Sequence, residues 1–166
     1  PFIACWPDRI AANTKSDQLI CNVDILSTMA ALLGQPLSDS AAPDSYNMVK
    51  ALTGNPSFQL RDHLILAGRH PKSISIRKGP WIFIPTRGDG GEALKRRGGP
   101  KAVAMSGRQN SDINPDGSIK DKAPLEQLYN LKNDPSQKNN CIRDHPEIAE
   151  DLKKLLKKLK NKQKTV

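Results

Sequence analysis

The feature that most constrains the fold of this chain is an amphipathic segment near its C-terminus. Asp144 with Glu147 resembles a capping box, and Pro146 suits the first turn of a helix. Apolar side chains then recur at i, +4, +7, +8 and +11, which places them on one side of that helix, and lysines occupy the other side. The apolar positions are Ile148, Leu152, Leu155, Leu156 and Leu159. The chain must therefore supply an apolar surface for this helix to cover.

Short strands upstream can supply that surface. Alternating and β-branched residues predict strands at 63–67, 73–77 and 81–84, and residues 125–131 could add a fourth. Lys78-Gly79-Pro80 predicts a hairpin turn between the second and third strands. Since a helix laid on a small sheet buries both apolar faces, we predict an α+β fold. Its small antiparallel sheet, of about four strands, packs on the C-terminal helix.

The N-terminal residues follow a different pattern. Residues 2–6 form an apolar run that predicts a strand buried on both faces of a sheet. Ser16 or Asp17 then caps a predicted helix, which Gly34 and Pro36 end. A strand followed by a helix is the repeating half-unit of an α/β layer fold, and a lone unit cannot cover a sheet. We expect this strand and helix to belong to a larger α/β core, and the true N-terminus to lie upstream of Pro1.

These patterns divide the chain into three parts. Residues 1–36 would end the larger α/β domain, residues 37–61 would be a linker, and residues 62–166 would form a C-terminal subdomain. Within the last part, residues 85–124 form a long segment of low apolar content. Loops of this length are usually functional or disordered, so both a functional role and a solvated excursion remain open.

Charge and apolar content argue against two classes of partner. The net charge is +9, but residues 153–166 contain seven lysines and no acid, which leaves +2 for the rest. A nucleic-acid-binding surface would carry arginine with interleaved aromatic residues, which this tail lacks. No run of about 18 apolar residues occurs, so no segment is expected to span a membrane. We expect neither nucleic acid nor a membrane as a partner.

The three cysteines, Cys5, Cys21 and Cys141, show no spacing that suits a metal site. They form no C-x-x-C pair and no Cys/His pattern of the kind that binds zinc. An odd number of cysteines cannot form a complete set of disulfides. We therefore expect buried free thiols and no metal ligands in this chain.

Four segments occur in an order that resembles one enzyme family. They are residues 1–10 with 16–26, Ser75-Ile76-Arg77-Lys78-Gly79-Pro80-Trp81, Gln127-Leu128-Tyr129-Asn130-Leu131-Lys132-Asn133-Asp134-Pro135, and His145-Pro146-Glu147-Ile148. Together they resemble the C-terminal portion of formylglycine-dependent sulfatases, which are arylsulfatase-like members of the alkaline phosphatase superfamily. Mainly residues 35–60 and 88–123 remain unmatched.

The resemblance implies hydrolysis of sulfate esters in aryl or carbohydrate sulfates. In such enzymes a formylglycine hydrate attacks sulfur, and a bound calcium ion polarises the sulfate. The family's calcium ligands come from Asp-Asp and Asp-Asn pairs that this chain does not contain as matching motifs. The resemblance therefore implies no catalytic residue, metal ligand or cofactor in this chain, which would need a missing N-terminal catalytic portion and be inactive alone. It also implies a periplasmic or extracellular location.

One motif invites a different interpretation. Cys5-Trp6-Pro7-Asp8-Arg9 satisfies C-x-P-x-R, the core sequence in which a sulfatase cysteine is oxidised to formylglycine. The fuller family signature has serine before the arginine and Thr-Gly shortly after it, and neither is present here. A cysteine in a buried strand also lacks an obvious means of activation. We interpret Cys5 as a packed structural cysteine.

Candidate substrate-binding residues follow the first predicted strand of the subdomain. The resemblance places His70 where the family often has a histidine facing the substrate, with Arg69 and Lys72 beside it. Arg87 and the run 95–97 could contact a sulfated glycan, because arginine forks fit oxyanions. Each of these residues could equally be a solvated loop residue. His63 and His145 are weaker candidates, at a strand start and a helix start.

Two other functions remain open on the sequence. One is a phosphodiesterase or phosphonate hydrolase of the same superfamily, which would differ at the missing catalytic residues. The other is a non-catalytic basic module that binds sulfated polysaccharide, for which binding would weaken as salt is added.

Overall fold

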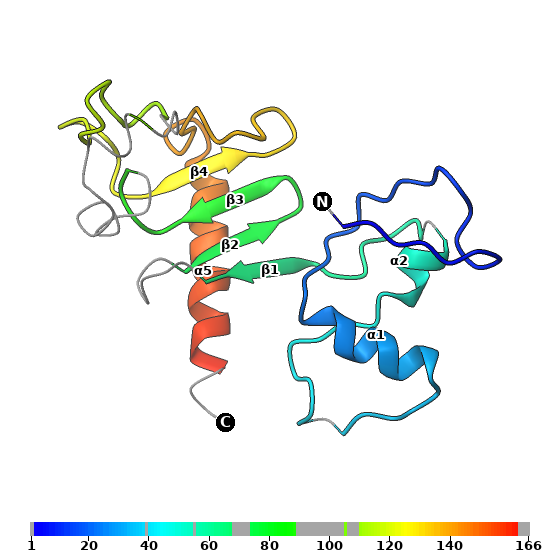
Figure 1. The fold of residues 1–166 in the computed structure, drawn as a ribbon. Helices are drawn as coiled ribbons and strands as arrows, with labels where there is room; N and C mark the ends of the chain where they lie inside the picture. Colours follow the sequence, from blue (N-terminus) through cyan, green and yellow to red (C-terminus); the bar gives the residue numbers. More distant parts are fainter. Residues whose placement is uncertain are drawn as a thin grey trace. The chain divides into compact units, whose positions relative to one another are not determined.

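The computed structural model describes residues 2–38, 40–54, 56–67, 74–88, 105 and 110–162, and the chain divides into two compact units, Pro1–Leu64 (unit 1) and Ile65–Val166 (unit 2). The elements, labelled as in Figure 1, are α1 (Asp24–Leu32), α2 (Val49–Thr53), β1 (His63–Leu66), β2 (Ser75–Lys78), β3 (Trp81–Ile84), β4 (Gln127–Asn130) and α5 (Pro146–Lys162). None of the helices in these described stretches is both long enough and apolar enough to cross a membrane.

The four strands form one sheet in the order β1-β2-β3-β4, so the predicted antiparallel sheet is confirmed. Ile76 of β2 lies opposite Phe83 of β3, and Phe83 lies opposite Leu128 of β4. The turn between β2 and β3 is the predicted one, since Gly79 takes a φ of 54° that suits glycine in a two-residue hairpin loop. This register aligns three apolar side chains in a row across the sheet.

Helix α5 packs on β2 and β3 over this row and closes the core of unit 2 (Figure 1). The buried members of the core come from both layers: Ile76, Phe83, Leu128, Ala149, Leu152 and Leu156. The predicted apolar stripe is therefore the packed face of the helix. The predicted cap is wrong by one residue, because the first helical bond runs from the amide of Ala149 to the carbonyl of His145, which makes His145 the N-cap and Pro146 the first helical residue.

The opposite face of the sheet is covered by part of the long segment 85–124. Side chains alternate along a strand, so Ile82 and Tyr129 point away from the row that α5 covers, yet both are buried. Asn110 donates a hydrogen bond of 3.1 Å from Nδ2 to the Tyr129 hydroxyl. Beyond it, Ile113 pairs with Ile119 in a short antiparallel bridge. The described end of this segment is thus a structural layer of unit 2.

Gly88 marks a close approach between two parts of this segment. It has a φ of 74°, and a Cβ placed there would lie 2.7 Å from Ile119 Cδ1 and 2.8 Å from its Cγ1. At Gly79, with a φ of 54°, nothing lies within 4 Å of such a Cβ. Alanine at either position therefore strains the backbone, but only at Gly88 must the neighbouring side chain also move.

We expect Gly79→Ala to lower the free energy of unfolding of unit 2 by about 1–2 kcal/mol and Gly88→Ala to lower it by roughly 1–3 kcal/mol more. Urea unfolding followed by Trp81 fluorescence, in a Trp6→Phe background, measures both. Equal losses for the two variants would show that the contact with Ile119 costs nothing.

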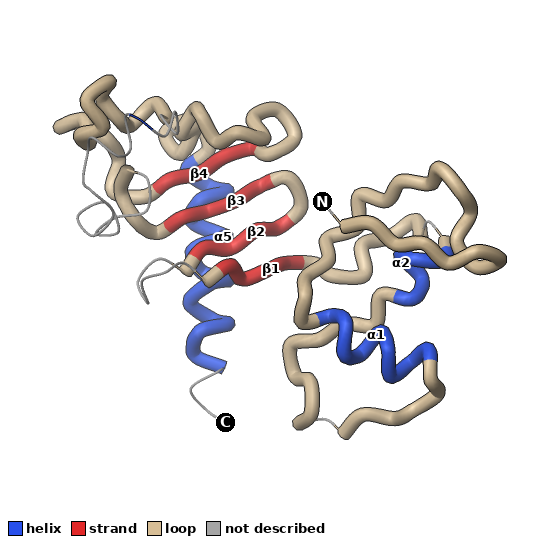
Figure 2. The backbone as a smooth tube through the Cα atoms, viewed as in Figure 1, coloured by secondary structure: helices blue, strands red, loops and turns tan. Residues whose placement is uncertain are grey.

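Unit 1 consists mostly of loop around two short helices (Figure 2). The side chain of Gln18 joins its loops. Gln18 Nε2 donates to the Phe58 carbonyl over 3.0 Å, and Gln18 Oε1 accepts from the Leu60 backbone amide over 2.9 Å. Gly34 terminates helix α1 as predicted, since it lies two residues after Leu32 and its φ of 64° allows the Gln35 amide to reach the Ala30 carbonyl.

The start of this helix is not where the sequence predicts it. The segment from Ser16 to Val23 is not helical, and α1 begins at Asp24. The reason is that Gln18 and Leu19 bond to residues 56–60 rather than to the next turn of a helix. The apolar spacing of that segment therefore does not produce a helix.

The predicted strand at residues 2–6 is also not formed. Within the described chain these residues belong to no strand, and Phe2, Ile3 and Trp6 are exposed. A strand needs a neighbour to satisfy its backbone groups, and the sheet of this chain is built from other residues. An apolar pentapeptide without a pairing partner stays at the surface.

Candidate functional site

The three predicted substrate-binding residues, Arg69, His70 and Lys72, lie outside the described residues. The strands on either side of them are described, with β1 ending at Leu66 and β2 beginning at Ser75. The Ser75 hydroxyl donates to the Leu66 carbonyl over 3.4 Å and ties together the two ends of the connection. The assignment of these three residues to substrate remains a prediction.

The weaker candidates have structural partners. His63 is partly buried, with Nδ1 3.6 Å from the Asp62 carboxylate. His145 contacts the ring of Trp81 edge-on, at 4.9 Å between centroids. Arg87 donates from Nη2 to the backbone carbonyls of Lys120, over 3.0 Å, and Asp121, so its guanidinium holds the long segment in place. The run 95–97 lies outside the described residues.

Cys5 is not the packed cysteine that the sequence predicts. It is exposed, as are the apolar residues around it. The following residues form a turn in which the amides of Arg9 and Ile10 bond to the Trp6 carbonyl, and the Arg9 guanidinium lies 5.6 Å from the centre of the Trp6 ring. The arginine of the C-x-P-x-R motif is thus engaged with the tryptophan of the same motif.

The other two cysteines are free and partly buried. The Cys141 thiol donates to the Leu128 carbonyl over 3.2 Å, beside the outer edge of β4. Burial raises the pKa of the Cys141 thiol. Cys141 is therefore a packing residue at a sheet edge rather than a reactive one.

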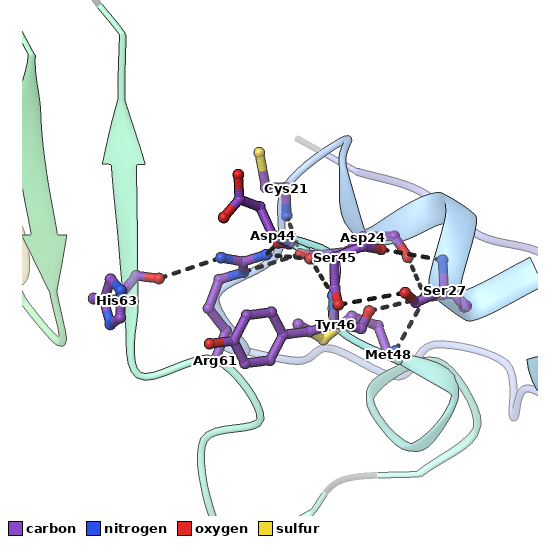
Figure 3. Close-up of polar contacts among 10 residues, drawn as sticks. Cys21, Asp24, Ser27, Asp44, Ser45, Tyr46, Met48, Arg61 and His63 are labelled. Atoms are coloured by element: carbon purple, nitrogen blue, oxygen red, sulfur yellow. Dashed lines mark hydrogen bonds and ion pairs between the residues drawn. The ribbon is translucent and has the colours of Figure 1, made fainter. Parts of the chain in front are cut away.

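The most elaborate polar cluster in unit 1 surrounds a buried ion pair between Asp24 and Arg61 (Figure 3). The two side chains are 2% and 6% exposed, and they meet through two parallel bonds, from Arg61 Nη2 to Asp24 Oδ1 and from Nε to Oδ2 over 3.1 Å. The Tyr46 amide donates to Oδ1 over 2.9 Å, and the Cys21 amide donates to Oδ2 over 2.8 Å. Both carboxylate oxygens of Asp24 thus accept two hydrogen bonds each.

The cluster extends along the polar side of α1. Thr28, one turn after Asp24, accepts a bond of 3.0 Å from the Met48 amide, and the Ser45 hydroxyl accepts one of 3.1 Å from the Ser27 amide. The Arg61 guanidinium also lies 4.3 Å from the centre of the Tyr46 ring. Because the carboxylate has no acceptor capacity left, the cluster is suited to holding residues 44–61 against α1 and not to binding substrate or metal.

Sequence reasoning missed this cluster, although one signal was present. Asp24 and Thr28 interrupt the apolar pattern of the helix at i and i+4, which marks a polar side that needs a partner. The partner, Arg61, is 37 residues away, and no local pattern identifies it.

A second buried polar cluster lies in unit 2, around Gln127 and Tyr129 of β4. The Tyr129 hydroxyl donates to Gln127 Oε1 over 2.6 Å, and Gln127 Nε2 donates to the Thr86 carbonyl over 2.7 Å. Burial raises the pKa of Tyr129 well above its usual value. The protonated phenol acts as the donor in its bond to Gln127. Every contact in this cluster joins parts of unit 2 to one another.

The described residues offer no set of ligands for a metal ion. Among them, no group of three or more His, Cys, Asp or Glu side chains converges on one point. The carboxylate with the greatest burial, Asp24, is already saturated by nitrogen donors. These residues therefore do not fit the calcium ion that the resemblance implies for a complete enzyme.

One curated protein is similar to nearly the whole chain. No family model matches the chain. Over 162 residues, which make up 98% of it, the chain is 32% identical to an N-acetylgalactosamine-6-O-sulfatase of Bacteroides thetaiotaomicron. The chain is therefore similar to part of a sulfatase. It spans 27% of the length of that sulfatase and matches its C-terminal portion.

Solved structures agree with this assignment. A structure from work on glycosaminoglycan metabolism by Bacteroides thetaiotaomicron, labelled as a 6S-sulfatase, matches 94% of the chain at 30% identity with a TM-score of 0.62, over 28% of its own length. Another, solved with its substrate D-glucosamine-2-N,6-O-disulfate, matches 96% of the chain at 16% identity with a TM-score of 0.58, over 28% of its length. The second likeness shows the fold alone. The α+β fold of this chain is thus found in the C-terminal part of sulfatases.

Proposed function

We propose that this chain is the C-terminal part of a sulfatase that hydrolyses sulfate esters of carbohydrates, and that it has no activity without the catalytic part. The observation that carries the proposal is the 32% identity to a sulfatase over 98% of the chain. The identity supports sulfate ester hydrolysis over a phosphodiesterase or phosphonate hydrolase, and over a non-catalytic basic module. An amino sugar carrying a 6-O-sulfate is the substrate class to test first, because the relative is named for one.

The catalytic groups are proposed to come from the part of the enzyme that this chain does not match. A sulfatase would need formylglycine and calcium, and neither fits the described residues. Cys5 is exposed just before a turn, and its motif partner Arg9 lies over Trp6. Among the residues that the structure describes, no carboxylate cluster is available for calcium. The role left for this chain is to complete the fold and to border the substrate.

Arg69, His70 and Lys72 are proposed to form that border. The two strands that flank them are held together at Leu66 and Ser75, so the connection leaves and re-enters the sheet at one place. Three basic side chains within four residues suit an anionic sulfate group, since charge-assisted hydrogen bonds to oxyanions are among the stronger polar interactions.

The organisation and location of the enzyme are also proposals. Residues 1–36 would end the catalytic α/β domain, residues 37–61 would connect it, and residues 62–166 would form the C-terminal subdomain. By family, the enzyme would act in the periplasm or outside the cell, where sulfated glycans are encountered.

The experiment that tests this proposal uses the sulfatase polypeptide that contains the chain. We expect it to release sulfate from N-acetylgalactosamine 6-sulfate, and we expect His70→Ala to lower kcat/KM about 10–100-fold, the loss that corresponds to one charge-assisted hydrogen bond. The matched control is His145→Ala, at the start of α5 against Trp81, which should leave kcat/KM unchanged. Equal effects of the two variants would remove His70 from the substrate border, and no sulfate release by the wild type would refute the proposed function.

A further inference from the structure

The outer side of helix α5 carries a concentration of positive charge. Helix α5 packs on β2 and β3 with its leucines (Figure 1), and four lysines lie on the side of the helix that points away from them. They occupy positions i, i+1, i+4 and i+5, which span roughly 140° of arc on a helix that turns about 100° per residue. All four are exposed to solvent. We call them the lysine face of α5, and they are Lys153, Lys154, Lys157 and Lys158.

Helix stability does not account for this charge. A helix that ends at Lys162 gains from lysines in its last turn, because they complement the helix dipole there, but that effect falls off within one turn. The lysine face lies before the last turn. Lys153 and Lys157 are also i,i+4 neighbours, as are Lys154 and Lys158, and like charges at that spacing destabilise a helix. A face that weakens its own helix indicates a role other than folding.

Neighbouring acids neutralise only part of the lysine face. Lys153 Nζ lies 2.7 Å from Glu126 Oε1, and Lys154 Nζ lies 3.9 Å from Glu150 Oε1. Across the stretches of chain that the structure describes, no acidic side chain pairs with the other two lysines of the face. Residues 152–162 contain no acid, so the helix itself supplies no compensation beyond its first two turns. The lysine face therefore keeps a net positive charge that an anionic partner can neutralise.

The chemistry of this face selects among anionic partners. A helix that binds a membrane needs a free apolar side, and the apolar side of α5 is packed against β2 and β3. Recognition of nucleic-acid bases relies on aromatic side chains and arginine forks, and residues 153–162 contain neither. A single sulfate is held by donors that converge on it, whereas these lysines are spread along about one and a half turns. The arrangement fits a linear polymer that carries negative charges at intervals.

We propose that the lysine face of α5 binds the sulfated polysaccharide chain that carries the sulfate ester to be hydrolysed. This inference rests on the proposed function, because a polymeric carbohydrate sulfate is the linear polyanion that such an enzyme meets. Lysine suits this task, since it is a point charge on a flexible stem and does not demand one fixed geometry from its partner. Docking raises the local concentration of the polymer, so the lysine face lowers KM for a polysaccharide and leaves KM for a monosaccharide unchanged.

Binding by the chain alone tests the proposal without catalysis. The probe is chondroitin 6-sulfate, a polysaccharide of N-acetylgalactosamine 6-sulfate and uronic acid, and the triple variant carries Lys154→Gln, Lys157→Gln and Lys158→Gln. We expect the Kd of the triple variant at low salt to be about 10–100-fold higher than that of the wild type, with a shallower dependence of log Kd on log salt. Circular dichroism should show unchanged helix content, because glutamine has a helix propensity close to that of lysine.

The matched control removes the same number of charges from exposed lysines of unit 2 that lie outside α5. It replaces Lys122, Lys132 and Lys138 by glutamine and should change Kd by less than about twofold. Equal losses for the two triple variants would show that binding follows net charge alone, and would overturn the proposal. Absence of binding by the wild type overturns it as well. Binding of duplex DNA but not of chondroitin 6-sulfate would assign the face to nucleic acid, with the same consequence.

Kinetics of the longer sulfatase polypeptide that contains the chain separate docking from hydrolysis. We expect the α5 triple variant to raise KM for chondroitin 6-sulfate about 10-fold and to leave kcat unchanged, with both constants unchanged for N-acetylgalactosamine 6-sulfate. An unchanged KM for the polymer, or sulfate release from the monosaccharide only, would overturn the proposal. The two proposals fail separately. A polypeptide that releases no sulfate but still binds the polysaccharide through α5 would keep the binding surface and refute the activity.

Discussion

Arg61→Ala is expected to lower the free energy of unfolding of unit 1 by about 3–5 kcal/mol. The substitution leaves the Asp24 carboxylate, 2% exposed, without its counter-ion, and desolvation of an unpaired charge is costly. It also removes the bond of 2.8 Å from Arg61 Nη2 to the Asp44 carbonyl and the contact with the Tyr46 ring. Because these bonds hold residues 44–61 against α1, their loss should open the unit.

Hydrogen–deuterium exchange measures this effect within one molecule. We expect Arg61→Ala to abolish most protection of the α1 amides while those of α5 serve as an internal reference in unit 2. The matched control is Arg9→Ala, which removes an exposed arginine whose partner is the Trp6 ring and should cost about 0–1 kcal/mol. Similar losses of protection for the two arginines would contradict the structural role of the ion pair.

Leu128→Ala is expected to lower the free energy of unfolding of unit 2 by about 2–5 kcal/mol. Leu128 is fully buried on β4, opposite Phe83 of β3 and in the same core as the apolar side chains of α5, so truncation removes apolar contacts and leaves a cavity. The same substitution at Leu125, three residues earlier and 76% exposed, should change the free energy by less than about 0.5 kcal/mol.

Urea unfolding followed by Trp81 fluorescence in the Trp6→Phe background separates the two leucines. Trp81 lies against the core of unit 2 and reports its loss. If Leu125→Ala proved as costly as Leu128→Ala, the assignment of the core to the row across β2, β3 and β4 would be wrong.

The parts of the fold that the sequence predicts correctly are those that local patterns determine. The stripe from Ile148 to Leu159 identifies the packed face of α5, and Gly79-Pro80 identifies the hairpin that sets the register of β2 and β3. These features depend on spacing and turn geometry within a few residues, which a sequence displays directly.

The parts that it predicts wrongly depend on distant partners. Residues 2–6 look like a buried strand because they are apolar, but burial requires neighbouring strands that this chain does not supply. The segment before Asp24 looks helical because its apolar residues recur, whereas Gln18 and Leu19 bond to residues some 40 positions away. Spacing predicts which side chains share a face, and it does not identify what covers that face.

For the candidate site, the sequence offers one prediction and misses one feature. The family resemblance predicts His70, with Arg69 and Lys72 beside it, at the substrate, and this stays a prediction because these residues lie outside the described part of the chain. The Asp24–Arg61 cluster has no motif, so neither the resemblance nor a local pattern indicates it. That cluster is a consequence of how unit 1 is held together.

We propose that this chain is part of a sulfatase whose catalytic groups lie in another part of the polypeptide. Sulfate release from N-acetylgalactosamine 6-sulfate, measured side by side for the purified chain and for the longer polypeptide, tests that claim most directly. We expect turnover by the longer polypeptide only, with Cys5 recovered as an unmodified thiol in both proteins by peptide mass spectrometry. Turnover by the chain alone, lost when Cys5 is replaced by alanine, would contradict it.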